Sequence, residues 1–233
     1  MRQFFKSLLF FAASAMMSLS AQAQSMVVVE LYTSQGCSSC PPADDFLTEV
    51  ASRDDVIALG LHVDYWDYLG WQDDLAQNAF TKRQAEFNTT MKSRYRLVTP
   101  QMIFNGRDYV AGPKRQKALK YINQLAGEPE KADLQLTRQG ETVEIVIRPL
   151  KGAAPGDIHV VRYTPEVARD IRRGENAGRK ITYTNTVTQW ETVASWDGTS
   201  ELRMTHPVSG DDHVAVILQT QNLGPIQAAR KLD

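Results

Sequence analysis

Two cysteines separated by two residues are the groups in this sequence best suited to do chemistry. They are the only cysteines among 233 residues, and they stand at Cys37 and Cys40 within the stretch GCSSCPP. Such a pair can form a structural disulfide, hold a metal ion, remain as inert thiols, or exchange thiols and disulfides with other molecules. Each role makes a different demand on the rest of the chain.

The spacing argues against a purely structural disulfide and against a closed zinc site. A loop of about four residues contributes only about 2 kcal/mol in the chain-entropy model, compared with about 4.7 kcal/mol for a loop of about a hundred. A tetrahedral zinc site needs further Cys or His ligands, and the sequence has no second C-x-x-C and only isolated histidines. Two thiolates alone could hold copper or zinc, so a soft-metal binding or carrier protein stays open as an alternative.

The residues around the cysteines predict a strand, a turn and a helix. Residues 26–31, MVVVEL, are typical of a strand buried on both faces. Pro41 and the proline after it fit the first turn of a helix, and apolar residues then recur at helical spacing. Residues 56–63 indicate a second buried strand, so a right-handed parallel βαβ unit is expected. This arrangement places Cys37 at a helix N-terminus, which favours its thiolate form.

An aromatic loop follows the second strand and carries Tyr65, Trp66, Tyr68 and Trp71. Ligands of open sheets meet the carboxyl ends of parallel strands, so this loop is expected on the same edge as the cysteines. Tyr65 and Trp66 are therefore our candidates for substrate binding. The alternative is that these aromatic side chains only pack against the next helix or against the second half of the chain.

The rest of the first half is predicted to form a helix, a hairpin and a last helix. Residues 74–95 carry an apolar stripe at helical spacing. The Asn-Gly pair at 105–106 is a strong turn signal, so residues 102–104 should pair antiparallel with residues 108–110. Residues 113–125 form the last predicted helix.

After residues 127–131, GEPEK, the apolar residues alternate with polar ones, which is typical of short strands with one buried face. We therefore expect an α/β domain over 24–126, a linker over 127–131, and a β-rich, sandwich-like domain over 132–233.

The N-terminus has the layout of a secretory signal peptide over residues 1–23. Arg2 and Lys6 precede a mostly apolar run over 8–19, and the small residues Ala21 and Ala23 fit cleavage after Ala23. The apolar run is too short to span a bilayer comfortably. We expect an exported protein without stable membrane insertion once the signal peptide is cleaved.

Charge and motifs narrow the classes of partner and cofactor. The 26 basic and 27 acidic residues are interspersed and give a formal net charge of −1, which argues against nucleic acid. No G-x-S-x-G motif or phosphate-binding glycine loop is present, and we expect no cofactor. The acidic pairs Asp44-Asp45 and Asp73-Asp74 are assigned to helix starts, where carboxylates interact favourably with the helix dipole.

The order of these elements resembles the thioredoxin fold, in which a strand ends at C-x-x-C and a proline precedes the third strand. In that superfamily the proline has a cis peptide bond and faces the disulfide. The resemblance implies the same for Pro100, and it assigns Thr99 and Pro100 to substrate binding. Gly36 differs from the tryptophan that usually precedes the first cysteine there, which argues against a general reductase.

The sequence resembles more closely an exported bacterial family called domain of unknown function 1223. The resemblance covers nearly the whole mature chain and implies a location in the bacterial periplasm or outside the cell. The segments that carry it are GCSSCPPAD, HVDYWDYLGW, VTPQM with its NG turn, GENAGRK and GPIQAAR.

These observations lead to the hypothesis of an exported thiol–disulfide oxidoreductase that acts on protein or peptide thiols and disulfides, together with a further redox partner. Cys37 is the nucleophile, Cys40 resolves the mixed disulfide, and Ser38 and Ser39 add hydroxyl donors. The β-rich half is expected to recognise a partner protein or to pair subunits. Two alternatives stay open, the metal carrier and a binding module with a structural disulfide.

Overall fold

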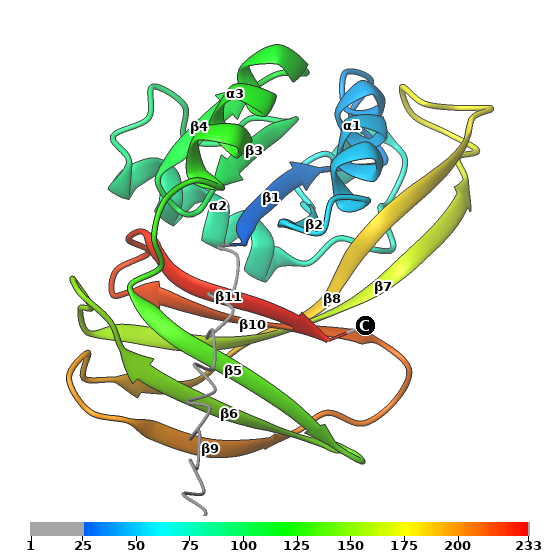
Figure 1. Cartoon of the computed structure of the whole chain (residues 1–233). Coiled ribbons are helices and arrows are strands. Elements are labelled where there is room, and N and C mark those ends of the chain that lie inside the picture. Colours follow the sequence, from blue (N-terminus) through cyan, green and yellow to red (C-terminus); the bar gives the residue numbers. More distant parts are fainter. Residues whose placement is uncertain (1–25, 233) are drawn as a thin grey trace, which may run out of the picture.

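The computed structural model describes residues 26–232 and has a mixed α/β architecture (Figure 1). Strand β1 (Val27–Thr33) leads to helix α1 (Pro41–Ala51), which returns to strand β2 (Val56–His62). The two strands pair in parallel, and every residue of both is buried. The βαβ unit is confirmed, because a continuous apolar run is suited to a strand that is covered on both faces. The predicted signal peptide, residues 1–23, lies outside the described residues.

Helix α2 spans Asn78–Thr90 and is shorter than the helix predicted over 74–95. Its N-terminal side differs because Asp73 and Asp74 accept hydrogen bonds from Gln35, which follows β1. The helix ends because Lys92 has a left-handed backbone, with φ of 49°, and because the Asn88 side chain donates to the carbonyl of Arg96. The apolar periodicity continues beyond both ends, but these side-chain hydrogen bonds limit the helix.

Strands β3 (Gln101–Phe104) and β4 (Asp108–Ala111) form the predicted antiparallel hairpin. Asn105 and Gly106 turn the chain with φ of 45° and 63°, which are values that an Asn-Gly turn favours. Helix α3 (Arg115–Leu125) follows, close to its predicted bounds. The predicted hairpin and last helix are therefore confirmed.

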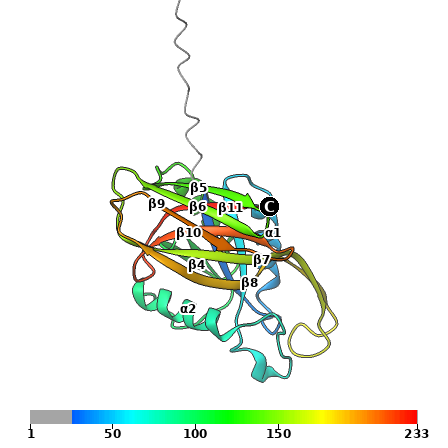
Figure 2. The same ribbon diagram turned by 90° about the horizontal axis from the view of Figure 1, so that it is seen from below.

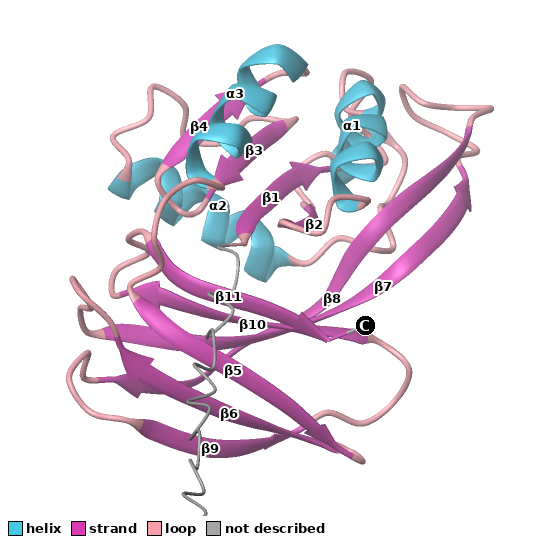
Figure 3. Ribbon diagram, viewed as in Figure 1, coloured by secondary structure: helices cyan, strands magenta, loops and turns pink. Residues whose placement is uncertain are grey.

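The second half consists of strands, as expected (Figure 3). They are β5 (Ala132–Gln139), β6 (Thr142–Pro149), β7 (Gly156–Asp170), β8 (Lys180–Trp196), β9 (Leu202–Pro207), β10 (His213–Thr220) and β11 (Ile226–Leu232).

The strands form two sheets, and both halves of the chain contribute to the larger one. Its order is β11-β10-β7-β8-β2-β1-β3-β4, and β8 joins β2 through the pair Gly60 and Thr186. The smaller sheet, β5-β6-β9, packs on β7, β10 and β11 through apolar residues such as Leu134, Ile145 and Val216 (Figure 2). The alternating residues of the second half therefore build a sandwich-like core. The division into two domains stays a prediction.

Helices α1 and α2 lie on opposite faces of the larger sheet. Val29 and Leu31 of β1 pack with α1 and α3, whereas Val28 and Tyr32 pack with α2 and with the second half. Successive residues of a strand point to opposite faces, so one strand supports both layers. The cysteines follow β1 directly and therefore stand on a segment that is buried on both sides.

Candidate redox site

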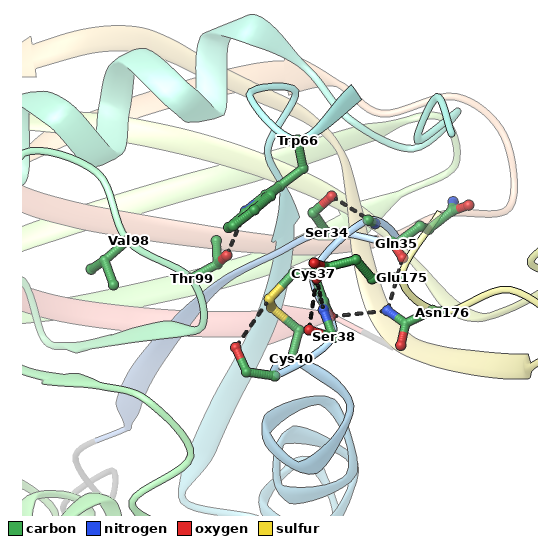
Figure 4. Close-up of a disulfide and its surroundings, with 12 residues drawn as sticks. Ser34, Gln35, Cys37, Ser38, Cys40, Trp66, Val98, Thr99, Glu175 and Asn176 are labelled. Atoms are coloured by element: carbon green, nitrogen blue, oxygen red, sulfur yellow. Dashed lines mark hydrogen bonds between the residues drawn. A yellow bond between two sulfur atoms is a disulfide. The ribbon is translucent and has the colours of Figure 1, made fainter. Parts of the chain in front are cut away.

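Cys37 and Cys40 form a disulfide at the junction between β1 and α1 (Figure 4). Cys40 is the N-cap residue of α1, and its carbonyl accepts hydrogen bonds from the backbone N–H groups of Ala43 and Asp44. Cys37 thus stands just before the helix, as predicted. Cys37 is 2 % exposed and Cys40 0 % exposed, so the nucleophile predicted from sequence is nearly as buried as the resolving residue.

The two serines between the cysteines differ in what they contact. The hydroxyl oxygen of Ser39 lies 3.5 Å from Sγ of Cys37 and is placed to interact with it. Ser38 was expected to supply a second hydroxyl donor to the same sulfur. Its hydroxyl instead donates to the carboxylate of Glu175, at 2.7 Å.

The predicted substrate-binding residues lie in two adjacent loops. Nε1 of Trp66 donates to Oγ1 of Thr99 at 2.7 Å, which joins the aromatic loop to the segment before β3 (Figure 4). The Thr99–Pro100 peptide bond is cis, as the resemblance implied. A side chain at Gly36 would place its Cβ 3.1 Å from Cβ of Trp66, so the cysteine loop and the aromatic loop are in close contact.

The ring of Tyr65 lies beside that of Trp66, with 6.1 Å between the two centroids, and its hydroxyl points to α2. Its hydroxyl donates to Oε1 of Gln84, and burial raises its pKa. The structure therefore brings Tyr65, Trp66 and Thr99 together beside the cysteine loop, and the Tyr65 hydroxyl also contacts α2. The role of all four predicted residues in substrate binding stays a prediction.

A buried hydrogen-bonded network that sequence reasoning missed lies under the cysteine loop. Asp73 accepts bonds from the backbone and side-chain N–H groups of Gln35, each at 2.8 Å, and its Oδ2 lies 2.7 Å from Nδ1 of His62. Nε1 of Trp71 donates to Oε1 of Gln35. Asp73 was assigned to a helix start, but it is 2 % exposed and holds the loop before the cysteines in place. Nothing in its sequence surroundings distinguishes it from a surface carboxylate.

A second buried polar cluster lies behind Cys40. Asp44 follows it by four residues on α1, and residues four apart on a helix share a face. In the described part of the chain, Oδ2 of Asp44 has no hydrogen-bond partner, and neither have Oγ1 of Thr33, Nε2 of His62 and the hydroxyl of Tyr183. Burial raises the pKa of Asp44 to about 7, although nearby His62 and Thr33 oppose the shift. A carboxyl group one helical turn after Cys40 can therefore exchange a proton near neutral pH.

The turn between β7 and β8 supplies two further residues to the site. Nδ2 of Asn176 donates to the carbonyl oxygens of Gln35 and Cys37, each at 2.9 Å. Oε2 of Glu175 accepts bonds from the backbone N–H and the hydroxyl of Ser38, at 3.3 and 2.7 Å. Both residues belong to GENAGRK, which the sequence resemblance picked out without indicating a role.

Within residues 26–232, no group of three or more His, Cys, Asp or Glu side chains is placed to hold a metal ion. A metal held by two thiolates would need both cysteines reduced. None of the helices in the same range is long and apolar enough to cross a bilayer.

The family described as "Protein of unknown function (DUF1223)" matches residues 28–219. The chain belongs to this family. The DUF1223 match covers both cysteines, the aromatic loop and the turn that carries Glu175.

Two solved structures are similar to this DUF1223 chain. Protein AGR_C_4864 from Agrobacterium tumefaciens has 35 % sequence identity and a TM-score of 0.77, over 91 % of this chain and 96 % of that one. HBP35 of Porphyromonas gingivalis has 14 % identity and a TM-score of 0.60, over 90 % of this chain and 75 % of that one, which indicates a similar fold alone. Comparison with curated proteins gave no significant match.

Proposed function

We propose that this protein is an exported thiol–disulfide oxidoreductase with a thioredoxin-like first half, in which Cys37 and Cys40 are the redox pair. The observation that carries the proposal is the position of their disulfide. It lies at a strand-to-helix junction, beside the two adjacent loops that hold Trp66 and Thr99. A helix N-terminus stabilises a thiolate, and a nearby resolving thiol allows a mixed disulfide to be released.

The reaction moves two electrons and two protons between a substrate dithiol and the pair. In the oxidising direction, a substrate thiolate attacks Sγ of Cys37, the bond to Cys40 breaks, and Cys40 leaves as a thiolate that takes up a proton. The second substrate thiol then loses its proton and attacks the substrate sulfur of the mixed disulfide. Cys37 leaves as a thiolate, is protonated, and the substrate disulfide is released. The reducing direction is the reverse of these steps.

The surroundings of Cys40 support this chemistry. Cys40 is 0 % exposed, so its thiolate cannot take a proton directly from bulk water. Asp44, whose pKa burial raises to about 7, lies one turn behind it and can supply or accept that proton. The backbone of Thr99 and Pro100 would present hydrogen-bonding groups to an extended peptide.

An exported location is part of the proposal. Disulfides persist in oxidising compartments such as the bacterial periplasm, and a C-x-x-C pair there finds thiol and disulfide partners. The substrates are proposed to be protein or peptide thiols and disulfides, and a separate redox partner is proposed to restore the pair after each cycle.

One observation favours a second candidate, a binding module with a structural disulfide. Cys37 is 2 % exposed, so a substrate can reach its sulfur only if the cysteine loop or the aromatic loop moves. A disulfide that never opens would need no such movement.

Two measurements test the proposed function and separate the candidates. Equilibration with thiol–disulfide buffers should give a reduction potential between roughly −280 and −120 mV, whereas a value below about −300 mV would indicate a resting structural disulfide. In cells, Cys40→Ser should accumulate mixed disulfides through Cys37, because the resolving thiol is absent. The matched variant Cys37→Ser should trap none. Equal trapping by both variants, or none by either, would contradict the proposal.

A further inference from the structure

The paired strands β7 and β8 extend beyond the sheets as an arm whose tip reaches the cysteine loop (Figures 1 and 2). Their pairing runs from Gly156 and Trp196 to Asp170 and Lys180, and residues 171–179 form the tip. The tip contributes a carboxylate and an amide to a redox pair that lies more than a hundred residues earlier in the chain. The arm is therefore placed to influence the disulfide.

Several contacts hold the arm in this position. Oγ1 of Thr184 lies 2.8 Å from Oγ1 of Thr48 on α1. Nε of Arg169 donates to the carboxylate of Asp74, which also accepts a bond from the Gln35 side chain. These contacts lie along the strands that lead to the tip, so the tip is not a free loop that touches the site by chance.

Asn176 is the buried contact at the tip. It is 2 % exposed, and its side-chain N–H groups satisfy two carbonyl oxygens of the cysteine loop, at Gln35 and Cys37. Its own Oδ1 accepts a bond from Arg179. An amide with both ends bonded in a buried position fixes the path of the backbone on either side of Gly36.

Glu175 places a negative charge on Ser38, the residue after Cys37. Its Oε2 accepts hydrogen bonds from both donors of Ser38. In reduced protein those donors would otherwise be available to stabilise a thiolate. A carboxylate in their place both occupies the donors and repels a second negative charge.

We propose that Glu175 and Asn176 are positioning residues of the redox pair, with Glu175 disfavouring the thiolate of reduced Cys37 and thereby stabilising the disulfide. Asn176 holds the tip and the cysteine loop together, so that the carboxylate stays on Ser38. A role of Glu175 and Asn176 in catalysis rests on the proposed function. In this arrangement, the arm from the second half of the chain lies at the cysteine pair, and Glu175 shifts the reduction potential of the pair toward the reducing end of its range.

Other charged and titratable groups lie around the pair and are unchanged by a substitution at Glu175. Besides Glu175, the arm carries cationic groups near its tip together with the carboxylates Glu166 and Asp170, and the groups beneath the cysteines are mixed. The cationic groups near the tip are Arg172, Arg173, Arg179 and Lys180, and the groups beneath the cysteines are Asp44 and Asp45 on α1, His62 on β2, and Asp73 and Asp74 in the loop before α2.

The test compares the full mature chain with Glu175→Gln. For reduced protein, the alkylation rate of Cys37 with iodoacetamide is followed against pH by mass spectrometry. For the redox equilibrium, the protein is equilibrated with glutathione buffers. At pH values below the midpoint of the Cys37 alkylation profile, we expect Glu175→Gln to have a three- to tenfold larger thiolate fraction than wild type. Its equilibrium constant with glutathione should shift by a similar factor toward the reduced form. Tenfold corresponds to about 30 mV for two electrons.

Glu86→Gln is the matched control, because it removes the same charge from an exposed position on α2, on the opposite face of the sheet. If Glu175→Gln and Glu86→Gln agree within twofold in both measurements, the proposal is overturned. The result is a ratio to wild type, so it stands whether or not the wild-type potential and the trapping experiment support the proposed function.

Two further variants test the link through Ser38 and Asn176. Ser38→Ala removes the 2.7 Å bond and should release Glu175 enough to give part of the same shift. In an Asn176→Ala background, Glu175→Gln should have less than half of its effect, because the tip no longer holds the carboxylate in place. The proposed geometry is contradicted if Ser38→Ala gives no shift and Glu175→Gln keeps its full effect in the Asn176→Ala background. If Asn176→Ala does not fold, the Ser38→Ala result suffices.

Discussion

Asp44 has lost contact with solvent without gaining a hydrogen bond to Oδ2 from any described residue. Burial disfavours its charged form and raises its pKa from 3.8 to about 7. Between about pH 4 and pH 7 the folded chain therefore holds a proton that the unfolded chain has released. The stabilising contribution of this group is complete below about pH 4 and is lost as the pH rises through about 7.

We predict that Asp44→Asn removes this dependence. The free energy of unfolding of the variant, relative to wild type, should rise with pH by up to about 1.4 kcal/mol per pH unit within the window and level off above about pH 7. Urea unfolding at a series of pH values from about 4 to 8 measures this difference, and other groups that titrate in both proteins cancel.

Asp54→Asn is the control, since it makes the same substitution at an exposed position that does not act on Asp44. A difference between Asp44→Asn and wild type that is constant from about pH 4 to 8 would contradict the prediction. Such a result would mean that Asp44 is already ionised in the folded protein at acidic pH.

The residues of the site that could be predicted were those with a local signature. The cysteines are marked by their spacing, and Pro100 by its place before a hairpin. Asp73 and Asn176 act through partners 38 and 141 residues away in the chain, so no nearby residue indicates their burial. For Asp44, the sequence indicated a helix start but not the face on which the side chain is buried.

At the scale of elements, the βαβ unit and the hairpin followed from local signals, because apolar runs, prolines and an Asn-Gly turn act over a few residues. The bounds of α2 did not follow, because Asp73 accepts a bond from Gln35 before the helix begins and Asn88 donates to the carbonyl of Arg96 beyond its end. The pairing of β8 with β2 was also not predictable. It involves a single residue pair, Gly60 and Thr186, between strands from different halves of the chain.

The turn of the β3–β4 hairpin is held against the turn between β10 and β11. A Cβ on Gly106 would lie 2.6 Å from the carbonyl oxygen of Gly224, and the φ of Gly106 is +63°. We predict that Gly106→Ala lowers the free energy of unfolding by about 2–4 kcal/mol, from about 1–2 kcal/mol for the left-handed backbone and the rest from the forced shift of a neighbouring backbone. Urea unfolding measures the change.

Gly112→Ala separates the two contributions. Gly112 also has a positive φ, of +81°, but a Cβ there would meet nothing within 4 Å, so only the backbone cost of about 1–2 kcal/mol is expected. Equal losses for the two variants would show that the two turns separate without cost, contrary to the close packing of these elements.

At the scale of the whole molecule, a buried ion pair joins the two halves. The guanidinium of Arg83 donates to Glu30 at 2.8 and 3.0 Å and to Oε1 of Gln219 at 3.1 Å. It also lies over the ring of Trp190, 3.8 Å from the centroid. The pair thus connects α2 and β1 with β10 and β8. An apolar cluster around it includes residues from both halves, so loss of the ion pair should destabilise both halves.

We predict that Arg83→Met lowers the free energy of unfolding by about 3–5 kcal/mol, because Glu30 is 1 % exposed and would keep a buried charge without its partner. The double variant Glu30→Gln with Arg83→Met should recover part of the loss, because glutamine is neutral and still accepts the bond from the hydroxyl of Tyr32. Hydrogen exchange in increasing urea, followed for peptides of β1 and β10, should show both losing protection at the same concentration. Loss at separate concentrations would instead support the two independent domains predicted over 24–126 and 132–233, and would mean that the ion pair stabilises one half alone.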